Sequence, residues 1–198
     1  MTRCLPPTPG GRPISRPEDR DEGMAEYPQH LVQHRVLFDG TPITIRPIRA
    51  EDAAMEQEFV RHLSEDSRYL RFMGTVRELP PKKLRFFTEI DYDRHMAFVA
   101  TTVQEGKQVE IGVVRYVATE KSGSCEFAIT VDDAWQGSGV AGLLMIALQE
   151  AARQHGFSTM EGLVMPTNRK MLKFARQLGF KVHREPGDRD TIHVELQL

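Results

Sequence analysis

A glycine-rich turn at residues 136–142, with the sequence QGSGVAG, is the feature that most limits how this chain can fold. It follows a segment typical of a buried strand, residues 125–131, and precedes a segment typical of an amphipathic helix, residues 140–155. A strand that leads through such a turn into a helix presents unpaired backbone N–H groups and the positive end of the helix dipole at one point. Phosphate groups bind at such points, so the sequence predicts a phosphorylated ligand here.

The first 34 residues differ in composition from the rest of the chain. They contain six prolines and a dense run of mixed charge, and they show almost no apolar periodicity. Such a segment cannot bury enough apolar surface to offset the entropy that it loses on ordering. We therefore expect a disordered tail over residues 1–34 and one folded domain over residues 35–198, which is long enough to bury a full core.

The middle of the chain predicts antiparallel strands beside short helices. Residues 96–103, 109–119 and 123–131 are rich in strand-forming residues and are separated by short turns. These three strands must be antiparallel, because a parallel pair needs a crossover of a dozen residues or more. A further strand is expected at residues 43–46, and helices are expected over residues 50–63, around residues 69–73 and after Pro80-Pro81.

The part of the chain after the glycine turn alternates between helix and strand. Apolar periodicity and glycine stops predict a helix at 140–155, a strand at 157–164, a helix at 167–178, a strand at 180–185 and a final strand at 191–198. Together with the strand at 125–131, they form a β-α-β-α-β unit and one more strand.

The same glycines also match the G-x-G-x-x-G fingerprint of dinucleotide-binding folds, with Glu161 about 20 residues further on. In those folds the first glycine follows its strand at once, and the strand begins a long parallel sheet. Here residues 132–136 intervene, the preceding strands are antiparallel, and too little chain follows Gly142 for two more βαβ units. A nicotinamide or flavin site is therefore disfavoured, and the lysine-containing P-loop pattern is absent.

Two motifs resemble those of the GNAT acyltransferase superfamily. Residues 136–141 resemble its Q/R-x-x-G-x-G/A signature, and Asn168, at the start of a helix that ends before Gly179, resembles its next motif. More narrowly, four segments look like the GNAT domain of bacterial Pat-type protein lysine acetyltransferases: residues 27–28, 39–48, 67–73 and 90–93.

The resemblance implies a fold and a cofactor. The fold is α/β (α+β), the GNAT fold, with a central mixed, mostly antiparallel sheet of about 6–7 strands and helices on both faces. The cofactor is acetyl-CoA, a co-substrate whose pyrophosphate lies on the backbone amides of the turn, and no metal is expected. The predicted cofactor-binding residues are Ile129, Thr130, Val131, Gln136, Gly137, Ser138, Gly139, Val140, Ala141, Gly142 and Asn168.

Glu126 is the candidate general base. A lysine ammonium has a reference pKa near 10.4, so exposing its lone pair at pH 7 costs about 4.6 kcal/mol. Glu126, Ala128 and Thr130 share one face of their strand, which is small and polar and suits a ligand cleft. The resemblance also places a base glutamate here, and the alternative is a glutamate merely exposed on a strand. Strand N–H groups at residues 129–131 would stabilise the oxyanion.

The departing thiolate has no obvious proton donor. Many GNAT enzymes place a tyrosine at the position that Ala175 holds here, so this chain lacks that general acid. The thiol of coenzyme A has a cysteine-like pKa near 8.5 and can leave without a dedicated acid. Covalent transfer through Cys125 is an alternative route, although its side chain should face the core, where thiols are usually inert.

The residues and the resemblance together predict an enzyme, an N-acetyltransferase that moves an acetyl or short acyl group from acetyl-CoA directly to an amine. The expected acceptor is a protein lysine side chain, and the resemblance implies an acyl-CoA synthetase as a possible protein partner. Two alternatives stay open. One is a small-molecule N-acetyltransferase that acts on an amino acid, a polyamine or a drug, and the other is a catalytically silent acyl-CoA-binding sensor.

Composition narrows the partners and the location. The formal net charge of −2 disfavours broad binding to nucleic acid or to an anionic membrane. The chain has no long apolar run and no secretory signal, and its two cysteines imply no disulfide, so we expect a cytoplasmic protein. Basic residues are in excess over residues 61–85, which indicates either a solvated helical face or a docking surface for an acidic partner.

Overall fold

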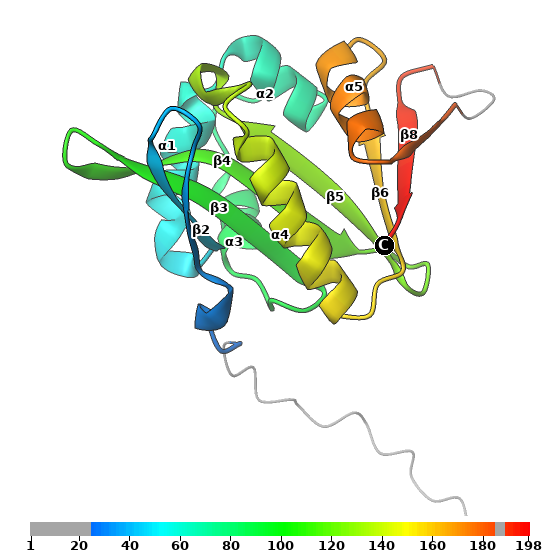
Figure 1. Cartoon of the computed structure of the whole chain (residues 1–198). Coiled ribbons are helices and arrows are strands. Elements are labelled where there is room, and N and C mark those ends of the chain that lie inside the picture. The colour runs from blue at the N-terminus through cyan, green and yellow to red at the C-terminus, as the bar shows by residue number, and fades with distance from the viewer. Residues whose placement is uncertain (1–24, 185–188) are drawn as a thin grey trace, which may run out of the picture.

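The computed structural model describes residues 25–184 and 189–198, in which one mixed sheet has helices on both faces (Figure 1). Its eight strands lie in the order β1-β2-β3-β4-β5-β6-β8-β7, and all neighbours are antiparallel except β5 and β6, which are parallel. The strands are β1 (Gln33–Val36), β2 (Pro42–Pro47), β3 (His95–Gln104), β4 (Lys107–Ala118), β5 (Ser124–Val131), β6 (Thr159–Val164), β7 (Lys181–His183) and β8 (Ile192–Gln197).

The helices divide between the two faces of the sheet. α4 packs on one face, against β3, β4 and β5, whereas α1 and α3 pack on the other face (Figure 1). Among the described residues, no helix has the length and apolar character needed to cross a bilayer. The α-helices are α1 (Ala53–His62), α2 (Glu65–Phe72), α3 (Pro81–Thr88), α4 (Val140–Gln154) and α5 (Arg169–Gln177), and the 3₁₀ helices are η1 (Gln29–Leu31), η2 (Ala50–Asp52) and η3 (Asp133–Trp135).

The predicted architecture is confirmed in its main features and differs in the number of strands. The antiparallel hairpins and the parallel pair that α4 connects are present, and the apolar stripe of α4 is buried, with Leu144 and Leu148 fully inaccessible. The sheet has eight strands rather than six or seven, because β1 spans the end of the expected tail and the first residues after it, where no strand was predicted. β8 pairs between β6 and β7, so the short β7 is an edge strand.

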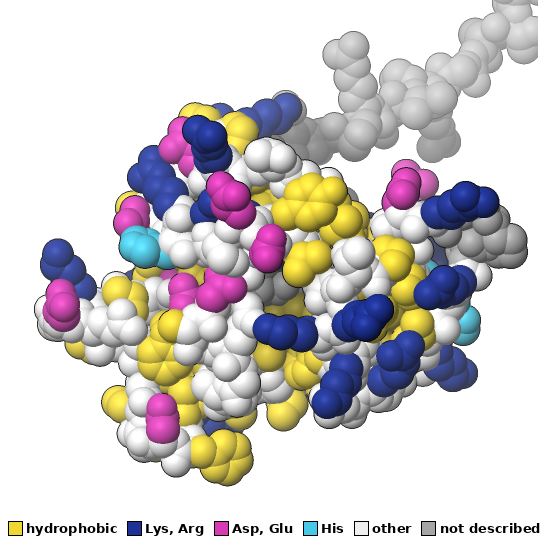
Figure 2. All heavy atoms as spheres, turned by 90° about the horizontal axis from the view of Figure 1, so that it is seen from above, with side chains coloured by type: hydrophobic (Ala, Val, Ile, Leu, Met, Phe, Trp, Pro, Cys, Tyr) yellow, Lys and Arg dark blue, Asp and Glu magenta, His cyan; other side chains and the backbone are white. Residues whose placement is uncertain are grey.

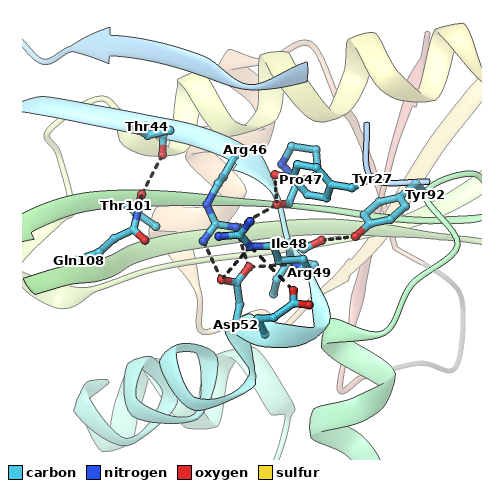
Figure 3. A network of polar contacts seen from close by, with 11 residues as sticks. Tyr27, Thr44, Arg46, Pro47, Ile48, Arg49, Asp52, Tyr92, Thr101 and Gln108 are labelled. Carbon is cyan, nitrogen blue, oxygen red and sulfur yellow. Dashed lines mark hydrogen bonds and ion pairs between the residues drawn. The ribbon is translucent and has the colours of Figure 1, made fainter. Parts of the chain in front are cut away.

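The folded structure begins earlier than residue 35. Residues 1–24 of the predicted tail lie outside the described residues, but the tail's last residues contribute η1 and β1. The Tyr27 hydroxyl donates to the Pro47 carbonyl (3.0 Å), and the Tyr27 ring packs edge-on against Tyr92, with centroids 5.8 Å apart (Figure 3). Beside them, Arg46 forms two hydrogen bonds to the buried Asp52 carboxylate, at 2.6 and 2.7 Å. Contacts distant in sequence therefore hold this segment, which composition alone could not indicate.

The Tyr27 hydroxyl should contribute measurably to stability. Tyr27→Phe should lower the free energy of unfolding by about 1 kcal/mol, the net value of one half-buried hydrogen bond. The loss stays small because Arg46 also donates to the Pro47 carbonyl (3.1 Å). Urea denaturation measures the change, with Tyr69→Phe as the control, since the Tyr69 ring is exposed on α2. Equal stability of Tyr27→Phe and the wild type would mean that residues 25–34 do not pack on the domain.

His95 should make the domain less stable in acid. Its ring packs 4.8 Å from Phe86, and burial and the charge of Arg115 lower its pKa to about 4. The folded protein therefore binds this proton less readily than the unfolded chain, whose histidines have a pKa near 6.5. The contribution of the neutral His95 ring to the free energy of unfolding is fully present above pH 6.5. On the order of 3 kcal/mol of it is lost as the pH drops toward 4. Between pH 7 and 4.5, the free energy of unfolding of His95→Gln, measured by urea denaturation, should decrease less than that of the wild type. An identical decrease in both proteins would refute this assignment.

Candidate active site

A cleft opens where β5 and β6 separate. The two strands pair only from Ser124 to Glu126, although β5 continues to Val131 and β6 to Val164. The Phe127 side chain lies beside Gly162, so close that a Cβ on this glycine would be 2.8 Å from the ring. A cleft of about 1000 Å³ occupies this region, and its walls come from β5, β6, α2, α3, α5 and the glycine turn.

Two amides of β5 point into the gap between the strands. The Asp132 amide donates to the Ile111 carbonyl of β4, and hydrogen-bonding direction alternates along a strand. The N–H groups of Ile129 and Val131 therefore face the other edge, which β6 has left unpaired. Both residues line the cleft, so their amides can donate to an oxygen atom inside it.

The glycine turn leaves a second group of amides free. Gly139 caps α4 with a φ of 95°, a conformation that favours glycine, and Gly137 has a φ of 84°. The amides of Gly137, Gly139, Ala141 and Gly142 donate to no described residue. They lie at the positive end of a helix of 15 residues, which is a favourable position for an anion.

The glycines of the turn fit a ligand that approaches the backbone closely. A Cβ added at Gly137, Gly139 or Gly142 would meet nothing within 4 Å. Gly142 lies inside α4 with an ordinary helical φ, where alanine would be more stable by about 1 kcal/mol. Packing within the described protein does not require glycine there, whereas a phosphate group resting on the turn would. The space and the donors therefore suit the pyrophosphate of acetyl-CoA.

The surface beside the turn is basic. Lys170 of α5 donates to Gln136 of the turn (3.2 Å). Figure 2 shows Lys and Arg side chains gathered on the right of the face seen from above, the side on which Figure 1 places α5. The exposed basic residues of α5 are Arg169, Lys170, Lys173 and Arg176. A cationic surface at this end of the cleft attracts a ligand that carries several phosphates.

Ten of the twelve predicted site residues line this cleft: Glu126, Ile129, Thr130, Val131, Gln136, Gly137, Gly139, Ala141, Gly142 and Asn168. Ser138 and Val140 do not. The Ser138 hydroxyl donates to the Trp135 carbonyl (2.6 Å), and the Val140 side chain is buried in the core. Both side chains hold the turn against the domain, and the prediction that these two residues bind the cofactor, through the backbone amides of the turn, stays a prediction. Asn168 caps α5 by accepting from the Met171 amide (3.0 Å).

Glu126 lies where the cleft meets α2. Its side chain is exposed and lines the cleft, whereas the neighbouring Cys125 and Phe127 are buried in the core, as strand alternation predicts. Arg71 of α2 and Lys83 of α3 also line the cleft. No local pattern distinguishes these two residues from the other basic residues of 61–85.

Hydrogen bonds to Asp133 connect the N-terminal end of α2 with the glycine turn. The Asp133 carboxylate of η3 accepts hydrogen bonds from the Ser64 amide and hydroxyl, both at 2.9 Å, and from the Ser67 hydroxyl at 2.7 Å. The Gln136 side chain also donates to it (3.4 Å). The two ends of the cleft are therefore positioned relative to each other by one side chain.

Among the described residues, no group of three or more His, Cys, Asp or Glu side chains could hold a metal ion.

Cys125 should not carry the acyl group. Its side chain is fully buried, and burial raises the pKa of its thiol to about 12, so the thiolate nucleophile is scarce at neutral pH. Cys125→Ala should keep kcat within about threefold of the wild type, because it changes only packing and a weak hydrogen bond to the Thr159 carbonyl (3.7 Å), and Cys125 does not line the cleft. Mass spectrometry of the enzyme quenched during turnover, in a Cys4→Ser background, should find no acyl group on Cys125. Trapping one there would contradict direct transfer.

Comparisons with known proteins agree with this geometry. The family described as Acetyltransferase (GNAT) domain matches residues 43–181. An acetyltransferase of Pseudomonas aeruginosa is 38% identical over 162 residues, which cover 82% of this chain and 87% of that protein. Acetyltransferase Pat of Mycolicibacterium smegmatis is 29% identical over 168 residues, which cover 79% of this chain but 50% of that protein. The crystal structure of the GNAT domain of Streptomyces lividans PAT superposes with a TM-score of 0.79 at 31% identity, over 87% of this chain and 100% of that one.

The fold and these relatives define an acyltransferase. The chain belongs to the GNAT family of acetyltransferases, as the sequence motifs indicated. Members of this family use acetyl-CoA as co-substrate. The residues of this chain that fit its pyrophosphate are those of the glycine turn.

Proposed function

We propose that the protein transfers an acetyl group from acetyl-CoA directly to an amine, most suitably the side chain of a protein lysine, with Glu126 as the general base. One observation carries the proposal: a single cleft presents the free amides of the glycine turn, the unpaired amides of β5 and the Glu126 carboxylate. The acyl donor supplies an activated thioester, and the residues of the chain orient it and move the proton.

The proposed steps follow the order of these groups along the cleft. Glu126 accepts a proton from the acceptor ammonium, directly or through one water, and the amine lone pair attacks the thioester carbonyl carbon. The N–H groups of Ile129 and Val131 stabilise the negative charge on the carbonyl oxygen. The C–S bond then breaks, the thiolate departs, and the nitrogen gives up its second proton to water or to the thiolate. No tyrosine donates a proton at the buried Ala175, which a leaving group with a pKa near 8.5 does not require.

A protein lysine is the acceptor that the resemblance to Pat-type enzymes favours, and an acyl-CoA synthetase is the first protein to test. The purified protein is incubated with acetyl-CoA and candidate synthetases, and acetyl-lysine is mapped by mass spectrometry. Modification of one lysine, dependent on Glu126, would support the proposal. If thiol is released only with small amines, the acceptor is a small molecule rather than a protein lysine. If acetyl-CoA binds and no thiol is released with any acceptor, the protein is a catalytically silent sensor. The cytoplasmic location stays a prediction.

A further inference from the structure

Two cationic side chains, Arg71 and Lys83, lie over the same phenylalanine ring in the wall of the cleft. The Phe72 and Phe87 rings stack with centroids 6.5 Å apart. The Arg71 guanidinium carbon lies 5.2 Å from the centre of the Phe72 ring, and the Lys83 Nζ lies 4.9 Å from the same centre. Both cationic side chains line the cleft.

Neither cationic side chain forms an ion pair within the part of the chain that the structure describes. Arg115, on the far side of Phe87, pairs with Glu56 at 3.2 Å, and Arg61 pairs with Glu78 at 2.8 Å. In contrast, the side chains of Arg71 and Lys83 form no ion pair and no hydrogen bond with any residue in the described ranges 25–184 and 189–198. Two neighbouring cations without such a partner are unfavourable in a partly desolvated wall.

The pKa values of both groups reflect this environment. Burial and the charge of Arg115 lower the pKa of Arg71 to about 10, although Glu56 and Glu126 act in the opposite direction. Burial and the charge of Arg71 lower the pKa of Lys83. An anion that enters the cleft therefore meets two cationic side chains close together. Unbalanced charges of this kind are typical of binding sites.

We propose that Arg71 and Lys83 form a subsite for a carboxylate that belongs to the acceptor and lies close to the amine facing Glu126. The inference rests on the proposed function and names the acceptor class within it: a lysine with an aspartate or glutamate beside it. The acceptor is the expected source of the carboxylate because Glu126, Ala128 and Thr130 project toward the α2 face of the sheet. Polyamines, which carry only positive charges, are disfavoured.

Matched peptides test this subsite. Two peptides that differ only in aspartate or asparagine next to the lysine are compared by kcat/KM, measured from thiol release. The wild type should prefer the aspartate peptide by about tenfold or more, the usual effect of a hydrogen bond between charged groups. Arg71→Gln and Lys83→Gln should each reduce this preference while changing kcat/KM for the asparagine peptide by less than about threefold. Arg71→Lys should keep part of the preference for the aspartate peptide.

Lys82→Gln is the matched control, because Lys82 is exposed on α3 and does not line the cleft. Its preference should equal that of the wild type. Equal rates of the wild type with both peptides would overturn the subsite. A change in the succinyl-CoA to acetyl-CoA rate ratio on Arg71→Gln, without a change in peptide preference, would assign the carboxylate to the acyl chain and would also overturn it.

A binding experiment separates failure of the subsite from failure of the proposed function. Glutarate is titrated into the wild type and the three glutamine variants at positions 71, 82 and 83, with binding followed by amide shifts in NMR spectra. The spectra also report whether each variant is folded. Even if no amine is acetylated, Arg71→Gln and Lys83→Gln should weaken glutarate binding by about tenfold and Lys82→Gln should not. Equal affinities in all four proteins would refute the carboxylate subsite.

Discussion

Glu126→Gln should lower kcat by about 10²–10⁴-fold at pH 7 while leaving the affinity for acetyl-CoA unchanged. This range is the usual contribution of a general base, and it is of the same order as the cost of exposing a lysine lone pair at neutral pH. Glutamine keeps the size and the position of the side chain but cannot take the proton. The acceptor must then lose its proton to water, so the rate of the variant should rise about tenfold per pH unit until the pH nears 10.4.

The measurement is steady-state thiol release from pH 6 to 9, together with calorimetry of acetyl-CoA binding. Glu161→Gln is the matched control, because Glu161 pairs with Glu126 in the parallel register of β5 and β6 but does not line the cleft. Its side chain contacts His193 at 3.3 Å, so a small loss of stability is expected without a change in pH profile. If kcat of Glu126→Gln equals that of the wild type across this range, Glu126 is not the base.

Gly139→Glu should weaken acetyl-CoA binding by at least about 10³-fold. A Cβ at this residue would meet nothing within 4 Å, so the new side chain extends into open space beside the free amides. Its carboxylate would compete for the N–H groups that suit a phosphate, and it would repel that phosphate. The φ of 95° adds backbone strain of about 1–2 kcal/mol, which acts on stability and not only on affinity.

Two controls separate these effects. Gly139→Ala introduces the strain without the charge and should weaken binding by no more than about tenfold. Gly106→Glu introduces the same charge at a φ of 77° in the β3–β4 hairpin, in open space outside the cleft, and should bind acetyl-CoA like the wild type. Undiminished calorimetric affinity of Gly139→Glu would show that the turn does not bind the phosphates.

The sequence predicted those features that depend on local rules. The glycines of the turn, the apolar stripe of α4 and the strand alternation around Glu126 each follow from backbone conformation or periodicity. The fold, and the fact that most of the predicted site residues line one cleft, could therefore be read from them. The direction of the Ser138 side chain could not be read from the sequence, because a turn serine can face either the ligand or its own loop, and here its hydroxyl donates to the Trp135 carbonyl.

The features that the sequence missed depend on contacts between distant segments. The separation of β5 from β6 beyond Glu126 has no local signal, because it involves the fit of Phe127 beside Gly162. Arg71 reaches the cleft because Asp133 fixes the start of α2, and the helical pattern of α2 does not specify which face meets β5. Tyr27 is ordered through its contact with Tyr92, far along the chain, which composition cannot reveal.

A crystal structure of the complex with coenzyme A or a non-hydrolysable acetyl analogue tests most directly whether the amides of the glycine turn bind the pyrophosphate and place the acyl group beside Glu126. The pyrophosphate oxygens should lie about 2.7–3.2 Å from the amides of Gly139, Ala141 and Gly142, and the acyl oxygen should face the amides of Ile129 and Val131, with Glu126 beside the acyl carbon. A pyrophosphate bound elsewhere, with the amides of the turn still unoccupied, would contradict it.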